Sequence, residues 1–261
     1  MIDEVLLERH GDVAVIRLHD PKTLNAMTPG MARAIADTLA HPPGGARAIL
    51  LAGSDRAFCA GANLWSGDHF DLDAPDFDAG AWLETLFNPM MRAFKACEVP
   101  IISAVCGAAA GVGASVALAA DLIVAGKGAY FLQAFSRVGL APDSGMPYLL
   151  ARSVGRARAM ELLLLAEKLP AQTALDWGLV TRVVDDADVE TTALALATRL
   201  AQGPTRALAL TRKSVWSGAE LGWEEELQTE SVQQSKAGKT RDFREGMAAF
   251  AEGRKPRFVG G

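Results

Sequence analysis

Two turns built from small residues, each following an apolar run typical of a buried strand, constrain this chain more than any other feature. The first lies in residues 56–64 (RAFCAGANL) and the second in residues 105–121 (VCGAAAGVGASVALAAD). Small residues let backbone N–H groups approach a ligand, and the first N–H groups of a helix have no partner within that helix. Two such turns brought together can stabilise a carbonyl oxygen as it becomes negative. The pair indicates chemistry on a carbonyl group, although by itself the first could be only a tight strand-to-loop turn and the second could only permit close helix packing.

The composition is that of a globular protein with a substantial core. The chain has 261 residues, of which 50% are hydrophobic, and this fits one large domain or one domain with a helical extension. A net charge of -5 disfavours a nucleic-acid partner. No apolar run approaches the length of a membrane helix, and residues 1–4 lack a signal-peptide pattern, so we expect a cytoplasmic protein with no membrane partner. The three cysteines, Cys59, Cys97 and Cys106, have no metal or redox spacing and are expected to be reduced thiols.

Strand, turn and helix alternate along the first two-thirds of the chain, which predicts an α/β core. The expected strands span residues 5–8, 13–18, 46–51, 101–105, 122–125 and 130–132; the expected helices begin at Thr28-Pro29 and span 82–97. Beyond residue 143 helices dominate, at 147–153, 156–166, 171–177, 188–202, 204–217, 221–235 and 242–252, with one extended segment at 180–184. We therefore expect a core in residues 1–199 and a helical C-terminal region in residues 200–261.

Six motifs, in order and spacing, resemble those of the crotonase family, the enoyl-CoA hydratase/isomerase superfamily. They are LNAM at 24–27, AFCAGANL at 57–64, GAAAGVGA at 107–114, AFSRVGLAPDSG at 134–145, ALDWGLV at 174–180 and DFREGMAAF at 242–250. The resemblance covers nearly the whole chain. It implies an α/β fold of the crotonase (ClpP-like) type, a spiral of ββα turns, whose helical C-terminal region packs homotrimers that often pair into hexamers.

The resemblance also implies a coenzyme A thioester as substrate, with no further cofactor and no metal. On the family pattern, the oxyanion donors are the backbone N–H groups of Ala62 and Val112, and the family usually has Gly at the Val112 position. The positions that grip the CoA nucleotide and pantetheine are Lys22, Leu24, Ala60, Asn63 and Leu64. Phe250 fits a position that closes over CoA, often from a neighbouring subunit, and Arg254 lies beside Gly253, which occupies a basic family position.

The acid–base positions of the family depart from the hydratase pattern. Hydratases use two glutamates, and the corresponding positions here are Ser115 and Phe135, neither of which transfers a proton as a carboxylate does. Asp143 is the remaining acidic candidate. Following Pro142 and preceding an apolar helix, it is a plausible helix cap.

The family resemblance gives Asp143 a second interpretation. Family isomerases that act on dienoyl-CoA, or on the ring-epoxide of phenylacetyl-CoA, place a catalytic Asp at this position. The latter type is the most similar, although it commonly has Gly and Thr where Met146 and Pro147 stand here. We expect an isomerase in which Asp143 moves a proton through an enolate, with its pKa raised by apolar neighbours. The candidates for those neighbours are Phe131, Phe135 and Leu140.

Several other functions remain open or are disfavoured by the sequence. A non-catalytic acyl-CoA-binding protein, or a hydratase that uses another acid or base, stays an alternative. A dehalogenase with Asp143 as nucleophile also needs a suitably placed His, but His10, His19, His41 and His69 all lie early in the chain. The sequence lacks a serine-hydrolase elbow, a phosphate loop and a complete dinucleotide fingerprint. The acidic loop does not match a calcium-binding loop, because Pro75 interrupts it and its spacing differs; its members are Asp68, Asp71, Asp73, Asp76 and Asp78.

Overall fold

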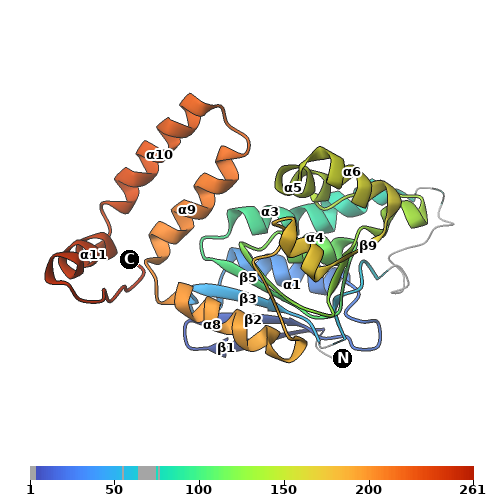
Figure 1. Cartoon of the computed structure of the whole chain (residues 1–261), viewed down its shortest axis with the longest axis horizontal. Helices are drawn as coiled ribbons and strands as arrows, with labels where there is room; N and C mark the ends of the chain where they lie inside the picture. Colours follow the sequence, from blue (N-terminus) through green and yellow to red (C-terminus); the bar gives the residue numbers. More distant parts are fainter. Residues whose placement is uncertain (1–3, 55, 64–74, 76) are drawn as a thin grey trace.

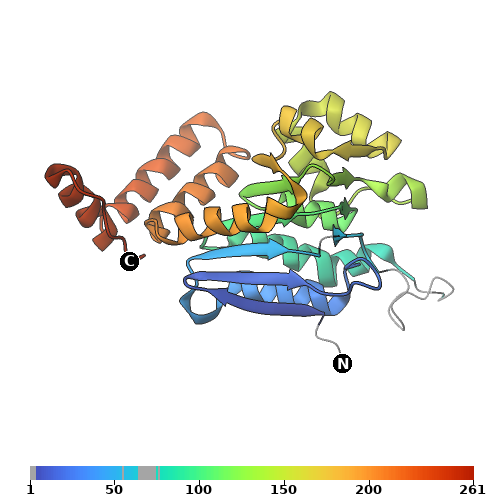
Figure 2. The same cartoon turned by 60° about the horizontal axis from the view of Figure 1, so that its bottom comes forward.

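The computed structural model describes residues 4–54, 56–63, 75 and 77–261, and it contains two β-sheets surrounded by helices (Figures 1 and 2). The larger sheet has the strand order β1-β2-β3-β5-β7-β10. β1 and β2 form an antiparallel hairpin, and the remaining neighbours are parallel. The bounds are β1 (Val5–His10), β2 (Val13–Leu18), β3 (Ala48–Ala52), β5 (Ile101–Val105), β7 (Leu122–Gly126) and β10 (Arg182–Val184).

A smaller sheet has the order β4-β6-β8-β9 and contains the strand that follows each of β3, β5 and β7. Its strands are β4 (Ala57–Cys59), β6 (Ala108–Ala110), β8 (Tyr130–Leu132) and β9 (Lys168–Pro170). The successive pairs β3–β4, β5–β6 and β7–β8 each place one strand in each sheet and are each followed by a helix. This repeated ββα unit confirms the predicted fold class. The sequence did not predict β6, which consists of three alanines, or β9, an edge strand that ends in proline, because neither has β-forming side chains.

The central strands of the larger sheet are buried on both faces. Ile16 and Leu51 face a core formed with helices α1 (Pro29–Ala40) and α3 (Asn88–Ala96), whereas Val15 and Leu50 face helix α8 (Val189–Ala201). A strand covered on both sides is apolar at every position rather than at alternate positions. This explains why the continuous apolar runs near residues 46–51 and 101–105 correctly predicted strands.

The helix expected at residues 82–97 is irregular. It begins earlier, as α2 (Ala79–Trp82) with Asp78 as its N-cap, passes through the π-helical turn η3 (Leu83–Phe87), and continues as α3. Pro89 has no N–H to donate to the carbonyl one helical turn before it, which disfavours regular α-helical bonding there. The N–H of Asn88 instead donates to the carbonyl oxygen of Leu83, five residues earlier. A π-turn of this kind often occurs at a functional site.

The remaining helices of the first two-thirds lie around the smaller sheet. They are α4 (Val112–Leu118), η4 (Ala134–Val138), α5 (Met146–Ser153), α6 (Gly155–Leu165) and α7 (Ala171–Asp176). Two short 3-10 turns, η1 (Pro43–Gly45) and η5 (Asp186–Asp188), complete the described elements of this part.

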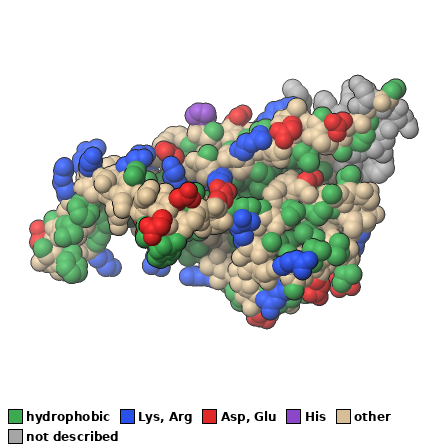
Figure 3. Space-filling model, turned by 90° about the horizontal axis from the view of Figure 1, so that it is seen from above, with side chains coloured by type: hydrophobic (Ala, Val, Ile, Leu, Met, Phe, Trp, Pro, Cys, Tyr) green, Lys and Arg blue, Asp and Glu red, His purple; other side chains and the backbone are tan. Residues whose placement is uncertain are grey.

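The last three helices form an arm that extends away from the two sheets (Figures 1 and 2). They are α9 (Thr205–Gly218), α10 (Trp223–Ala237) and α11 (Arg241–Glu252). Hydrophobic side chains lie on the surface of this arm (Figure 3). The large hydrophobic residues exposed on these helices include Val215, Trp223, Val232, Met247 and Phe250. No helix in the described part of the chain is long and apolar enough to cross a bilayer. The boundary at residue 200 and the trimeric assembly of this region stay predictions.

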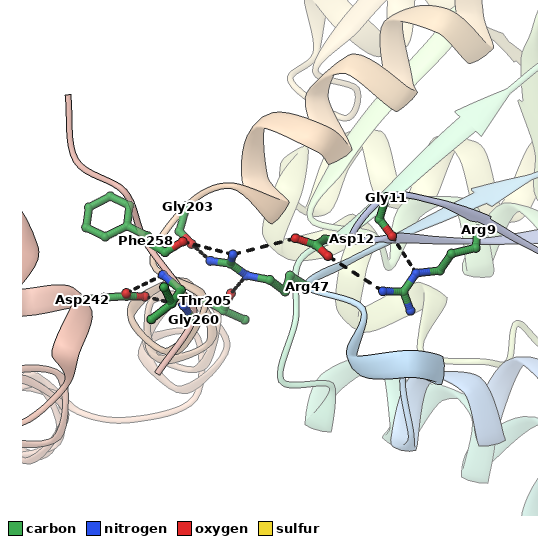
Figure 4. Close-up of polar contacts among 10 residues, drawn as sticks. Arg9, Gly11, Asp12, Arg47, Gly203, Thr205, Asp242, Phe258 and Gly260 are labelled. Atoms are coloured by element: carbon green, nitrogen blue, oxygen red, sulfur yellow. Dashed lines mark hydrogen bonds and ion pairs between the residues drawn. The ribbon is translucent and has the colours of Figure 1, made fainter.

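The C-terminal tail, residues 253–261, forms hydrogen bonds with both the core and the arm (Figure 4). The guanidinium group of Arg47, which precedes β3, donates to the Thr205 hydroxyl at 2.8 Å and to the Phe258 carbonyl oxygen at 3.2 Å. The buried carboxylate of Asp242, at the start of α11, accepts hydrogen bonds from the N–H groups of Val259 at 2.7 Å and Gly260 at 2.8 Å. The tail therefore contacts the core on one side and α11 on the other.

Candidate active site

The two small-residue turns identified in the sequence lie side by side. Gly61 follows β4, Gly111 follows β6, and these two strands are neighbours in the smaller sheet. Both glycines have positive φ, +115° and +51°. A Cβ added to Gly111 would lie 3.8 Å from the Cα of Gly61, and one added to Gly61 would lie 3.4 Å from the carbonyl oxygen of Ala110. These distances are ordinary contacts, so the positive φ, which is strained for other residues, is what favours glycine at both positions.

The N–H groups of Ala62 and Val112 are not used by the backbone pairing of the described residues. Met27 forms a parallel bridge with Ala62, but the bridge uses the carbonyl of Gly61 (2.7 Å) and the N–H of Asn63 (2.9 Å). Val112 is the first residue of α4, where a helix offers no internal acceptor. Both residues line the same cavity, whose volume is about 410 Å³. Two residues whose N–H groups are not used in backbone pairing within the described ranges thus line one cavity.

Asp143 is the only titratable residue among the described residues that line this cavity. The other walls are apolar or small. Trp82, Leu83 and Phe87 come from the irregular helix, and the remaining members include Phe135, Val138, Leu140 and Ala141. Leu86 and Met90, on the same irregular helix, are instead buried in the core. A carboxyl group and two backbone donors share one apolar chamber.

The Asp143 side chain does not cap the helix that follows it. Helix α5 begins at Met146, its N-cap is Gly145, and no side chain makes the capping hydrogen bond. The N–H of Met146 donates instead to the backbone carbonyl of Asp143 at 3.0 Å. The Asp143 carboxylate accepts a hydrogen bond from the Ser144 hydroxyl at 2.8 Å. The helix-cap interpretation of Asp143 is therefore wrong.

Burial raises the pKa of Asp143 above its ordinary value, and the hydrogen bond from Ser144 opposes that shift. Phe135 and Leu140, two of the three apolar neighbours expected from the sequence, line the cavity with Asp143. Phe131 is instead buried in the hydrophobic core. The raised pKa makes this carboxylate a better proton acceptor than an exposed aspartate.

The two positions at which the resemblance places hydratase glutamates carry no acid or base. Phe135 lies in the cavity wall and is 8% exposed. Ser115 is fully buried in α4, and its hydroxyl donates to the carbonyl oxygen of Gly111 at 3.4 Å, within its own helix. These two side chains therefore cannot take part in proton transfer in the way that carboxylates would.

The loop that carries Lys22 and Leu24 is fixed against the end of β4. Leu24 and Asn25 both adopt φ of +57°, and the buried Asn25 amide donates to the carbonyl oxygen of Ala57 at 2.9 Å. The N–H of Ala60 donates to the Leu24 carbonyl oxygen at 3.0 Å. The structure therefore brings Leu24 and Ala60 together, beside the cavity that Ala60 also lines, with the exposed Lys22 on the same loop.

The remaining residues assigned from the resemblance are placed differently. Leu64 lies outside the described residues, as do Asp68, Asp71, Asp73 and Asp76 of the acidic loop. Phe250, on α11, is 85% exposed, and Arg254 forms ion pairs with Glu245 and Glu252. α11 lies at the far end of the arm, away from the sheets and from α4 (Figure 1), so a single chain does not bring these residues to the cavity.

Sequence reasoning missed Ser144, and it also missed Ala79 and Gly80 in the cavity wall. Ser144 has φ of +51°, and its hydroxyl donates to the Asp143 carboxylate at 2.8 Å. A polar residue directly after the candidate Asp was the only signal in the sequence. The small residues at 79–80 gave a weaker signal, because alanine and glycine also occur at ordinary helix starts.

Comparison with known proteins agrees with this geometry. The family model described as enoyl-CoA hydratase/isomerase matches residues 8–261. A Rhodobacter capsulatus protein described as a probable enoyl-CoA hydratase is 41% identical over 248 residues, covering 95% of each chain. The 1,2-epoxyphenylacetyl-CoA isomerase of Escherichia coli is 38% identical over 262 residues, covering 100% of each. Among solved structures, an enoyl-CoA hydratase from Polaromonas sp. JS666 superposes with a TM-score of 0.88 at 31% identity, over 97% of this chain and 99% of that one.

The family match spans nearly the whole chain, and the fold and the paired turns are those that the sequence motifs predicted. The chain belongs to the enoyl-CoA hydratase/isomerase family.

Proposed function

We propose that this family member is an isomerase that moves a double bond, or opens an epoxide, in the acyl group of a coenzyme A thioester. One observation carries the proposal: Asp143 is the sole titratable residue in the described cavity wall, which also contains Ala62 and Val112. Isomerisation needs one group that takes a proton from one carbon and returns it to another. The usual hydration route needs two carboxylates, and Ser115 and Phe135 stand at those positions.

In the proposed reaction, the thioester oxygen accepts hydrogen bonds from the N–H groups of Ala62 and Val112. These bonds strengthen as the oxygen gains negative charge, and one such donor is worth about 3–4 kcal/mol in a well-characterised case. The Asp143 carboxylate removes a proton from the carbon next to the thioester, and the electron pair forms an enolate. In double-bond migration, the same group, now protonated, returns the proton to another carbon of the conjugated system. In epoxide opening, the electron pair of the enolate forms a carbon–carbon double bond as a C–O bond of the epoxide breaks, and the proton goes to the released oxygen. In either reaction the substrate and product have equal mass.

The substrate's CoA portion is proposed to lie along the loop and strand end that carry Lys22, Leu24, Ala60, Asn63 and Leu64. The fixed contact between Leu24 and Ala60 supports a preformed surface there. Phe250 and Arg254 are proposed to act on the CoA of a second copy in a homotrimer or a dimer of trimers. Their distance from the cavity within one chain supports that arrangement.

The purified protein would be incubated with trans-3-enoyl-CoA, 2-enoyl-CoA and 1,2-epoxyphenylacetyl-CoA. The products would be separated by chromatography, and their masses would be measured by mass spectrometry. We expect an isomer without a change of mass, and about a 10²–10⁴-fold loss of rate in Asp143→Asn. Asp176→Asn, at an aspartate that accepts a hydrogen bond from Gln172 within its own short helix, is the matched control and should retain the rate. A product heavier by one water would make the protein a hydratase. Binding of all three thioesters without turnover would indicate that the protein only binds acyl-CoA. Hydration or binding without turnover would each overturn the proposal.

A further inference from the structure

The segment that carries Asp143 has a strained backbone. Ser144 has φ of +51° and Gly145 has φ of +73°, so two consecutive residues are left-handed before α5 begins. Gly145 adopts this conformation without steric cost, because glycine has no side chain. Ser144 has a side chain and therefore adopts it at a cost. A non-glycine residue held in this region costs free energy, and such residues cluster at functional sites. The serine side chain therefore needs an explanation.

The Ser144 side chain is buried and directed at the neighbouring carboxylate. Ser144 is 2% exposed, and its hydroxyl donates a hydrogen bond of 2.8 Å to Oδ1 of Asp143. No other hydrogen bond to the Asp143 carboxylate occurs within the described part of the chain. One carboxylate oxygen is thus held by the protein, and the second, Oδ2, remains for a ligand in the cavity that Asp143 lines.

We propose that Ser144 is a positioning residue, which holds Oδ1 of Asp143 so that Oδ2 meets the carbon-bound proton of the substrate. The inference rests on the proposed role of Asp143 as the base. The left-handed backbone turns the hydroxyl back toward the preceding side chain. Fixing one oxygen restricts rotation of the carboxylate, and small errors in the placement of a reacting group can cost a large factor in rate.

The charged groups on the elements around Asp143 are occupied elsewhere. Arg137 on η4 donates to the Ala166 carbonyl, and Glu84 on η3 pairs with Arg92 at 3.3 Å. On α5, the Tyr148 hydroxyl donates to Glu220, the Arg152 guanidinium lies over the Tyr148 ring, and α4 carries no charged residue. Within the described residues, burial raises the pKa of the Asp143 carboxyl and the hydrogen bond from Ser144 lowers it. Removing the hydroxyl should therefore raise the pKa of Asp143, because a hydrogen bond to the ionised form is lost.

Two variants distinguish the effect of the Ser144 hydroxyl from the effect of the strained backbone. Ser144→Ala removes the hydroxyl and keeps the strained conformation, whereas Ser144→Gly removes the hydroxyl and relieves the strain, so it should fold at least as well. Ser136→Ala, at a more exposed serine on η4 whose hydroxyl donates to the Leu164 carbonyl at 3.3 Å, is the matched control. Turnover of trans-3-enoyl-CoA would be followed across pH for each variant.

We expect both Ser144 variants to lower kcat about ten- to a hundredfold with KM unchanged, and to move the acid limb of kcat to higher pH. A Ser144→Gly enzyme with the wild-type kcat and the wild-type acid limb would overturn the proposal.

A second readout does not depend on turnover. The Asp143 carboxyl carbon would be titrated by NMR in ¹³C-labelled protein, with its signal assigned by its loss in Asp143→Asn. A titration that moves to higher pH in Ser144→Gly supports the hydrogen bond, and an unmoved titration contradicts it. If Asp143→Asn retains turnover, the proposed function fails, whereas loss in Asp143→Asn with unchanged Ser144 variants removes only the positioning role.

Discussion

Gly113, the second residue of α4, has no room for a side chain. A Cβ at this position would lie 2.5 Å from the carbonyl oxygen and 2.6 Å from the Cβ of Cys59. Gly113→Ala would push the start of α4 away from β4, and such overpacking typically costs about 1–3 kcal/mol. Because the Val112 N–H would move with it, we also expect kcat to fall about 10²-fold. Chemical denaturation would measure the loss of stability, and steady-state kinetics would measure the fall in kcat. Gly139→Ala cannot serve as a control, because Gly139 has φ of +74° and any side chain there is strained.

Asp143 sets the pH dependence expected of the enzyme. Burial raises its pKa above the ordinary 3.8. A general base works only when ionised, so kcat/KM should fall as the pH drops through this raised pKa and should be level above it. A pH profile of kcat/KM on trans-3-enoyl-CoA would show the acid limb above the range of an exposed aspartate. A rate that stays level down to pH values near 3.8 would contradict the assignment.

At the scale of elements, an ion pair whose arginine is buried anchors α9 to the core. The Arg212 side chain, 6% exposed, lies 2.6 Å from a carboxylate oxygen of Asp121 and also donates to the Phe94 carbonyl at 2.9 Å. Arg212→Ala would leave the Asp121 carboxylate, whose side chain is 22% exposed, without its charged partner, and would remove the donors to the Phe94 carbonyl, so we expect a loss of about 1–3 kcal/mol. Arg206→Ala on the same helix removes an exposed pair with Glu98 and should cost about 0–1 kcal/mol. Equal losses in urea denaturation would refute the anchoring role.

The sequence predicted well those elements whose local pattern of apolar residues matches their burial in the fold. β3 and β5 are buried on both faces, so their continuous apolar runs were sufficient. The π-turn at residues 83–87 was not predictable, because periodicity does not distinguish an α-turn from a wider one. β6 was missed because its three alanines become a strand only through pairing with β4 and β8. The cap interpretation of Asp143 failed because Ser144 and Gly145 turn the chain before α5 begins.

At the scale of the whole molecule, the sequence predicted the two turns and their contact, but not the separation of α11 from the cavity. The position of Phe250 depends on how the arm leaves the core, and no local pattern encodes that direction. The C-terminal tail helps to set it through Arg47 and Asp242 (Figure 4).

Asp242→Asn would weaken the hold on this tail. An amide accepts hydrogen bonds less strongly than a carboxylate, so the N–H groups of Val259 and Gly260 should exchange with deuterium faster. Glu252→Gln, which alters an exposed ion pair at the end of the same helix, should leave their exchange unchanged. Mass spectrometry of the C-terminal peptide would measure both. Equal exchange in Asp242→Asn and the parent protein would mean that other contacts hold the tail.

The groups proposed to activate the thioester belong to the main chain at Ala62 and Val112. Every amino acid except proline keeps a backbone N–H, so an alanine scan cannot detect these donors. Proline would remove the N–H but would also fix φ, so replacing one amide with an ester through semisynthesis is the more specific way to delete a donor. Random mutation can likewise exchange the acid–base side chain while both donors persist, so drift at the Asp143, Ser115 and Phe135 positions can change the reaction without rebuilding the scaffold.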